Sequence, residues 1–175
     1  GKPVFLLNSP EDRQELMKRI YGIDRVLLAP FDREMMTLPW DAFVEQKLVR
    51  DLNAVHLVAG HDYHFGYKNQ GDPRLLQEKC RELGLGCDII PKVEVDGITV
   101  SSTYIRQLVE SGDVERAAHF LGHRHCMTQT VGHGQRIGRT IGIPTVNLAV
   151  PGHVLVPKHG VYVSRVYLPG GKSYA

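Results

Sequence analysis

Three consecutive hydroxyl side chains, followed closely by an arginine, form the first group of residues that could do chemistry. Ser101, Ser102 and Thr103 follow an apolar run and precede an amphipathic stretch, which places them where a strand ends and a helix begins. The free N–H groups of a first helical turn favour an anion. Arg106 lies four residues after Ser102, so its guanidinium group could hold the same anion from the side. The alternative is an ordinary helix cap with a surface arginine.

A second group lies in the stretch AGHDYHFGYKNQGD (59–72), which follows an apolar run and leads into a helical pattern. Tyr63, Phe65 and Tyr67 could line a flat slot for an aromatic ring, and Asp62 could accept hydrogen bonds from N–H groups of that ring. The stretch follows the carboxyl end of an expected parallel strand, where open α/β sheets bind ligands. The alternative is a connecting loop whose Phe65 fills the core.

The third group is the stretch VGHGQRIGRTIGIPTVNL (131–148), in which glycines recur every two to four residues. Such a loop exposes backbone N–H groups to phosphates, and its arginines add positive charge. Thr145 and Asn147 then lie on the same side of a strand, and their oxygen atoms suit Mg²⁺ at the phosphates of a nucleotide. A glycine-rich hairpin without a ligand is the alternative. The candidate residues are Gly132, Gly134, Gly138, Arg139, Gly142, Thr145 and Asn147.

The nine histidines and three cysteines are the remaining residues that could bind a metal ion. His61 and His64 are three residues apart but lie among glycines, so they belong to a loop rather than to one helix face. His123, His125 and Cys126 cluster further along the chain. No CxxC pair is present, and the pattern favours hydrogen-bonding roles for the histidines and reduced core thiols for the cysteines.

Short apolar runs alternate with amphipathic stretches up to about residue 122, which predicts a parallel sheet covered by helices. The predicted strands are RVLLAPF (25–31), AVHLVAG (54–60) and CDIIPKV (87–93). Helices are predicted from Pro10 behind a Ser9 cap, after Pro39, around Leu75–Leu83, after Ser102 and after Asp113.

The pattern changes from about His123, after a short join near residues 122–124. TQTV, IGIPTVNL and GVYVSRVYL are short apolar runs separated by glycine and proline, which predicts an antiparallel sheet or barrel. We expect the first half to lack an opening strand, and the second to stop in a hairpin turn before its return strand. The chain is therefore expected to be a fragment.

Composition excludes several classes of protein. Lys and Arg number 21 against 19 Asp and Glu, and the resulting net charge of +2 argues against a broad nucleic-acid-binding face. No apolar run approaches the roughly 18–20 residues of a membrane-spanning helix, and the first residues have no signal-peptide pattern. We expect a cytoplasmic protein with small-molecule ligands.

Taken in order, these segments resemble the bacterial bifunctional riboflavin kinase/FMN adenylyltransferases, or FAD synthetases. LLAPFD (27–32) and GHDYHFG (60–66) resemble a strand end and the flavin loop of that family. SSTYIR (101–106) matches its Ser-Ser-Thr-x-Ile-Arg signature, and GRTIGIPTVNL (138–148) matches the Gly-x-Pro-Thr-x-Asn segment of the kinase. The last two motifs together, some forty residues apart, are highly specific.

The resemblance implies two ATP-dependent steps, phosphorylation of riboflavin to FMN and adenylylation of FMN to FAD with release of pyrophosphate. In the adenylyltransferase, Ser101, Ser102, Thr103 and Arg106 would hold the β- and γ-phosphates of ATP. Asp62, Tyr63 and Phe65 would face the flavin. In the kinase, the glycine loop would cover ATP, with Thr145 and Asn147 at the phosphates and Mg²⁺.

The resemblance also implies a fold. Residues 1–122 would be an FMN adenylyltransferase domain of Rossmann-like α/β architecture, without its first strand and His-x-Gly-His-type motif. Residues 123–175 would be the first part of an antiparallel riboflavin kinase β-barrel, with the catalytic Glu expected beyond residue 175. Because these groups are missing, the isolated chain is expected to have little activity.

Two other classes of function are compatible with the same residues. One is a non-catalytic module that binds flavin or nucleotide, and the other is a structural domain stabilised by zinc on the histidines. Loss of FAD formation alone on changing Arg106, and of FMN formation alone on changing Thr145 or Asn147, would favour the enzyme.

Overall fold

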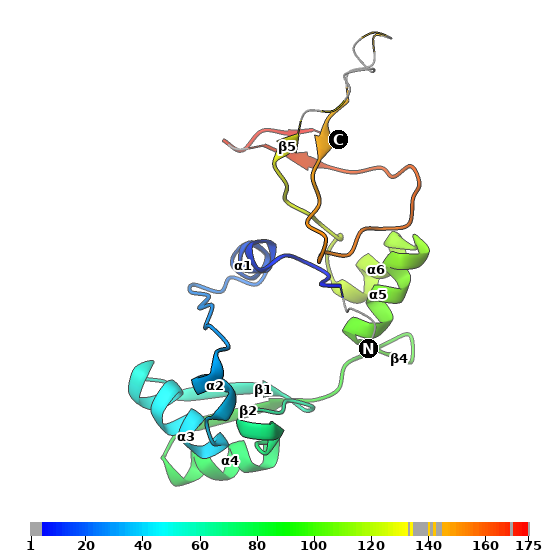
Figure 1. The fold of residues 1–175 in the computed structure, drawn as a ribbon. Coiled ribbons are helices and arrows are strands. Elements are labelled where there is room, and N and C mark those ends of the chain that lie inside the picture. The colour runs from blue at the N-terminus through cyan, green and yellow to red at the C-terminus, as the bar shows by residue number, and fades with distance from the viewer. Residues whose placement is uncertain are drawn as a thin grey trace. The chain divides into compact units, whose positions relative to one another are not determined.

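The protein is an α/β chain with small two-stranded sheets, one parallel and the others antiparallel among the residues described. The computed structural model describes residues 5–132, 134, 140, 142, 145–168 and 170–174. It divides into two compact units, one of residues Leu27–Thr99 and one that combines Gly1–Val26 with Val100–Ala175 (Figure 1).

The unit of residues 27–99 is built on two parallel strands, β1 (His56–Gly60) and β2 (Gly86–Ile90). Parallel strands need a crossover connection, and α4 (Pro73–Glu82) supplies it. Asp72 caps α4 by accepting a hydrogen bond from the Leu75 N–H at 2.8 Å. The alternation of strand and helix predicted from the sequence is confirmed here.

One face of this sheet packs on the core. Ala59 of β1 joins Val44, Phe65, Leu76 and Cys80 in a buried cluster. On the opposite face of β1, Val58 is exposed, as the two-residue period of a strand requires. The apolar stripe of α4 accounts for Leu76 and Cys80, which lie one turn apart.

Three helical segments precede β1: α2 (Arg33–Thr37), α3 (Trp40–Ala42) and the π-helix η1 (Phe43–Asp51). In Figure 1, α3 and α4 lie beside the β1–β2 pair. Lys79 of α4 is 9% exposed, and its Nζ lies 2.7 Å from Glu45 of η1 and 3.1 Å from Glu82. The buried ammonium group is therefore paired on both sides, which offsets its desolvation.

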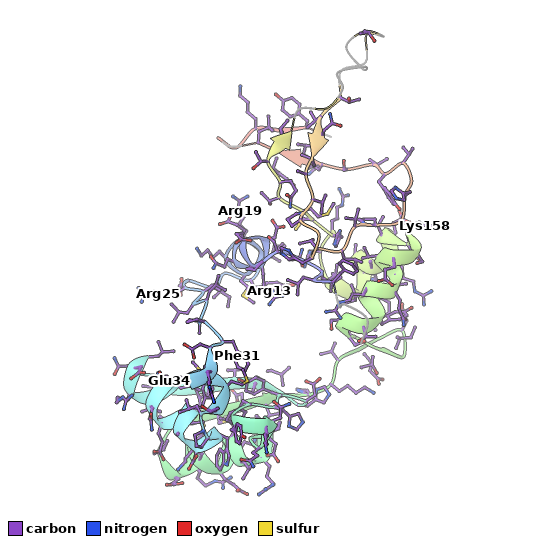
Figure 2. The ribbon with its side chains drawn as sticks, in the orientation of Figure 1. Arg13, Arg19, Arg25, Phe31, Glu34 and Lys158 are labelled. Atoms are coloured by element: carbon purple, nitrogen blue, oxygen red, sulfur yellow. The ribbon has the colours of Figure 1, made fainter. Side chains whose placement is uncertain are left out.

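Residues 25–31 do not form the buried strand that their apolar run predicts. They have no strand partner among the described residues, and Leu27, Leu28 and Phe31 are exposed, Phe31 by 76%. Figure 2 labels Phe31 of this segment and Glu34 of α2, the helix that follows it. An extended segment becomes a strand only when a neighbour pairs with its backbone. The boundary between the two units also falls inside this segment, between Val26 and Leu27.

A hairpin that the sequence analysis did not predict closes this unit. Strands β3 (Glu94–Val95) and β4 (Ile98–Thr99) pair in antiparallel fashion around Asp96 and Gly97. Both turn residues have positive φ, 52° and 72°, which the tight hairpin turn requires and Asp-Gly tolerates.

The other unit contains three of the predicted helices. α1 (Pro10–Arg19) begins behind the Ser9 cap, whose Oγ accepts from the Asp12 N–H at 3.0 Å. α5 (Ser102–Ser111) and α6 (Val114–Leu121) pack together, and the Tyr104 and Phe120 rings meet edge to face with centroids 4.9 Å apart. Within the described residues, no helix has the length and apolar character needed to cross a membrane.

The later strands of this unit are shorter than the sequence predicts. β5 (Val131–Gly132) pairs with β6 (Asn147–Leu148), and β7 (Val166–Tyr167) pairs with β8 (Ser173–Tyr174), both antiparallel. Of the predicted strand 160–168, only β7 is paired. The expectation that the last hairpin lacks its return strand is wrong, because β8 supplies a short one. Gly170 and Gly171, both with φ near 85°, turn the chain between β7 and β8.

Gly71→Ala should destabilise the unit of residues 27–99 by about 1–3 kcal/mol, because the added methyl group overpacks the core. A Cβ on Gly71 would lie 2.9 Å from both the ring and the carbonyl oxygen of Phe65. Trp40, the only tryptophan of the chain, contacts Phe65 edge to face and reports unfolding of this unit by its fluorescence in urea.

Gly152→Ala is the matched control, because a Cβ there meets nothing within 4 Å. Its free energy of unfolding, measured by circular dichroism, should lie within about 0.5 kcal/mol of the wild-type value. Equal stability of Gly71→Ala and wild type would contradict the packing described for Phe65.

Candidate functional site

The first turn of α5 collects the three predicted hydroxyl groups. Ser101 is the N-cap, and its Oγ accepts a hydrogen bond from the Tyr104 N–H at 3.2 Å. Ser102 and Thr103 follow with exposed side chains. The hydroxyl groups and free N–H groups of this turn can therefore be reached by an anion from solvent.

Arg106 lies over the same turn, as its spacing predicts. Its Nη1 donates to the Ser102 Oγ at 3.1 Å, and its Nε donates to the carbonyl oxygen of Phe5 at 2.9 Å. The first contact confirms the predicted proximity of Arg106 and Ser102. The second contact fixes the Nε end of the guanidinium group. No local signal in the sequence indicated a contact with Phe5.

The second group of predicted residues lies in the unit of residues 27–99, where the chain leaves β1 at its carboxyl end. Asp62 is exposed. Tyr63 stacks on Phe65 with ring centroids 5.2 Å apart and an angle of 14° between the rings. Tyr63 is 41% exposed, whereas Phe65 is 6% exposed and belongs to the core. Phe65 thus fills the core, as the alternative interpretation held, and supports one face of Tyr63.

Burial raises the pKa of the Tyr63 hydroxyl above its ordinary value. The hydroxyl therefore stays protonated at neutral pH and can donate a hydrogen bond. The loop that carries it is itself held in place: the Tyr67 N–H donates to the Leu38 carbonyl at 2.7 Å, and Phe65 pairs with Gly71 as an isolated bridge. Both contacts hold the part of the loop that follows Tyr63.

The third group is described in part. Gly132 and Asn147 pair across β5 and β6, and a Cβ added to Gly134 would collide with the side-chain amide of Asn147. Gly132 and Gly134 therefore lie next to Asn147. Thr145 and Asn147 both have exposed side chains, and Gly142 has a positive φ of 74°. Gly138 and Arg139 lie outside the described residues.

The histidine cluster has a structural role in the join between the two predicted halves. His125 Nε2 lies 3.1 Å from the Leu7 carbonyl oxygen, to which its N–H donates. Burial is the largest effect and lowers the pKa of His125, the hydrogen bond to the Leu7 carbonyl opposes it, and the smaller effects of His123 and Asp12 lower and raise the pKa respectively. The folded protein therefore favours the neutral imidazole.

The described part of the chain contains no group of three or more His, Cys, Asp or Glu residues placed to hold a metal ion. All three cysteines are free thiols, with Cys80 buried and the other two half-buried. Burial, followed by the contact with Cys87, raises the pKa of the Cys80 thiol to about 11. At neutral pH Cys80 is therefore a protonated core residue.

Two family models match the chain in succession. The model described as FAD synthetase matches residues 1–104, and the model described as riboflavin kinase matches residues 121–175. The first match covers more than half of the chain. This α/β chain belongs to the FAD synthetase family.

Curated relatives match over nearly the whole chain. Proteins named bifunctional riboflavin kinase/FMN adenylyltransferase are 36% identical in Listeria monocytogenes over 97% of this chain, and 34% identical in Haemophilus influenzae over 95%. These matches cover 53% and 56% of the two relatives, so the chain spans about half of their length. A protein of the same name from Bacillus subtilis is 30% identical over 97% of this chain and 52% of its own length.

A solved structure shares the fold. The crystal structure named as a macrolide-efflux protein from Streptococcus pneumoniae matches with a TM-score of 0.80 and 32% sequence identity. The match covers 96% of this chain and 53% of that one.

Lowering the pH should destabilise the unit that contains His125 more in wild type than in His125→Asn. A lowered pKa in the folded state means that the unfolded chain takes up a proton first as the pH falls. The stabilisation is therefore complete above the ordinary histidine pKa of about 6.5 and is lost as the pH falls through the lower folded value.

Urea unfolding at pH 7.5 and 5.5, followed by circular dichroism, measures the effect as the difference in pH dependence between wild type and variant. His64→Asn, which changes an exposed histidine, is the control and should keep the wild-type pH dependence. If His125→Asn left the pH dependence of the free energy of unfolding unchanged, the lowered pKa of His125 in the folded protein would be contradicted.

Proposed function

We propose that this chain is part of an enzyme of FAD biosynthesis with two ATP-dependent activities. In the first reaction, the terminal hydroxyl of riboflavin attacks the γ-phosphorus of ATP, and ADP leaves with FMN as product. In the second, a phosphate oxygen of FMN attacks the α-phosphorus of another ATP, forming FAD and releasing pyrophosphate. Both reactions depend chiefly on aligned oxygens and neutralised charge.

The first turn of α5 supports a role in the adenylyl transfer. The departing pyrophosphate carries the negative charge that develops in this reaction. The hydroxyls of Ser101, Ser102 and Thr103, the free N–H groups of the helix and the guanidinium of Arg106 offer donors to that charge. The Arg106–Ser102 hydrogen bond already holds two of these groups side by side at 3.1 Å.

The loop after β1 supports flavin binding. Tyr63 presents a ring that Phe65 backs within the core, and a rigid, partly exposed aromatic ring suits stacking on an isoalloxazine. The exposed Asp62 carboxylate accepts hydrogen bonds, so it can receive an N–H of the flavin. We assign Phe65 to the support of Tyr63 within this site.

The glycine loop supports binding of the ATP that is used in the kinase reaction. A side chain at Gly134 would displace the Asn147 amide, so the close approach of loop and strand depends on glycine there. Thr145 and Asn147 expose oxygen atoms of the kind that Mg²⁺ accepts and would hold the ion. When bound, Mg²⁺ neutralises phosphate charge. Gly132, Gly138, Arg139 and Gly142 complete the proposed ATP loop.

We also infer the architecture that these sites require. The parallel β1–β2 pair with its α4 crossover is compatible with a Rossmann-like domain in residues 1–122, and the antiparallel β5–β6 and β7–β8 pairs are compatible with a β-barrel in residues 123–175. We place the protein in the cytoplasm, with flavins and nucleotides as its ligands.

The observation that carries the proposal is the hydrogen bond between Arg106 and Ser102 at a hydroxyl-rich helix start. The close approach of Gly134 to the Asn147 side chain, later in the chain, supports the second site. The two family models match in the same order along the chain. A binding module without catalysis would keep the same groups, so the enzyme is favoured by the two family models and by the relatives named as bifunctional enzymes.

Arg106→Ala should reduce FAD formation about 100-fold while leaving FMN formation within about twofold, because a charged donor to the leaving group is lost. Asn147→Ala and Thr145→Ala should do the reverse. Both activities are assayed by chromatography of flavin products, using the longest native protein that contains this chain.

Arg50→Ala is the control for loss of an arginine, since Arg50 pairs with Asp51 on the exposed side of η1. It should leave both activities unchanged. If Arg106→Ala and Asn147→Ala each reduced both activities equally, with folding intact by circular dichroism, the assignment of two separate sites would be wrong.

A further inference from the structure

Four consecutive residues, Phe5–Asn8, run through the unit that contains α5 and are called the strap here. Each residue of the strap makes a hydrogen bond to a segment distant in sequence. The Phe5 carbonyl accepts from Arg106 Nε at 2.9 Å, and the Leu7 carbonyl accepts from His125 Nε2 at 3.1 Å. The Asn8 Nδ2 donates to the Cys126 carbonyl at 3.2 Å.

Leu6 anchors the middle of the strap. Its N–H donates to the His153 carbonyl at 2.9 Å, and its carbonyl accepts from the Leu155 N–H at 2.8 Å. Leu6 thereby forms a parallel bridge with Val154, which is 3% exposed. The strap is therefore held by backbone and side-chain contacts to residues 125–126 and 153–155, all within the riboflavin kinase match.

The segment 153–162 also holds α5 at its other end. The Lys158 N–H donates to the Val109 carbonyl at 3.3 Å, and Tyr162 lies against Gly112 at the end of the helix. Figure 2 shows Lys158 at the α5–α6 pair. The strap and this segment thus fix the helix that carries Arg106 at both of its ends.

We propose that the strap is a positioning element for Arg106, so that residues of the riboflavin kinase match control the affinity of the α5 phosphate site through the Phe5 carbonyl. This inference rests on the proposed function of α5. With Nε committed to Phe5 and Nη1 to Ser102, the guanidinium plane is fixed before a phosphate binds. A guanidinium oriented before binding loses less side-chain freedom when the anion arrives.

Asn8→Ala and His125→Ala test the proposal, because each removes one side-chain anchor of the strap and neither residue belongs to the proposed sites. Calorimetric titration of this chain with inorganic pyrophosphate should show binding weakened about fivefold in each variant. Glu11→Gln, which changes an exposed side chain on the adjacent α1, is the matched control and should bind pyrophosphate as wild type does.

A double-mutant cycle separates positioning from general loss of structure. Asn8→Ala should weaken pyrophosphate binding in the wild-type background but have no further effect in Arg106→Ala, since the strap acts through that side chain. In nuclear magnetic resonance spectra of wild type, the Arg106 Nε–H should exchange slowly with solvent, and in Asn8→Ala it should exchange several times faster.

The outcomes distinguish the inference from the function on which it rests. If Arg106→Ala leaves pyrophosphate binding unchanged, the proposed function of α5 fails and the inference fails with it. If Arg106→Ala weakens binding while Asn8→Ala and His125→Ala bind pyrophosphate as wild type does, the inference alone is overturned. An equal loss from Asn8→Ala in both backgrounds would also overturn it, because the strap would then act on structure in general.

Discussion

The hydrogen bond from Arg106 to the Phe5 carbonyl connects the local chemistry of α5 to the rest of its unit. Ser101 and Ser102 need only the start of a helix to be in place, but the direction of the guanidinium group depends on a segment about one hundred residues earlier. That segment is in turn held by Val154 and its neighbours. The proposed anion site therefore depends on folding of the whole unit, and α5 alone would not reproduce it.

The unit of residues 27–99 depends on a different contact, the insertion of Phe65 between the helices and the sheet. Phe65 packs with Val44, Leu76 and Cys80, and Gly71 makes room for its ring. The same ring supports Tyr63 at the surface. A single buried aromatic residue thus stabilises the core and supports the proposed flavin-binding side chain.

Features with local causes could be predicted from the sequence. Ser9 and Ser101 cap their helices as their positions indicate, and Arg106 reaches Ser102 because residues four apart share a helix face. The unpaired segment 25–31 could not be predicted, since an apolar run forms a strand only if a neighbour pairs with it. The strap had no local signal at all. The Asp96–Gly97 hairpin has a recognisable signal, because Asp-Gly is a favoured two-residue turn between strands.

An amide chemical-shift map of this chain, recorded as ATP and Mg²⁺ are added, would locate the two proposed nucleotide sites. We expect shifts at the first turn of α5, around residues 102–106, and a second set around Gly132, Gly134 and Asn147. The second set should disappear in Asn147→Ala while the first remains. Shifts confined to other residues, or none at saturating ATP, would show that neither site binds the nucleotide.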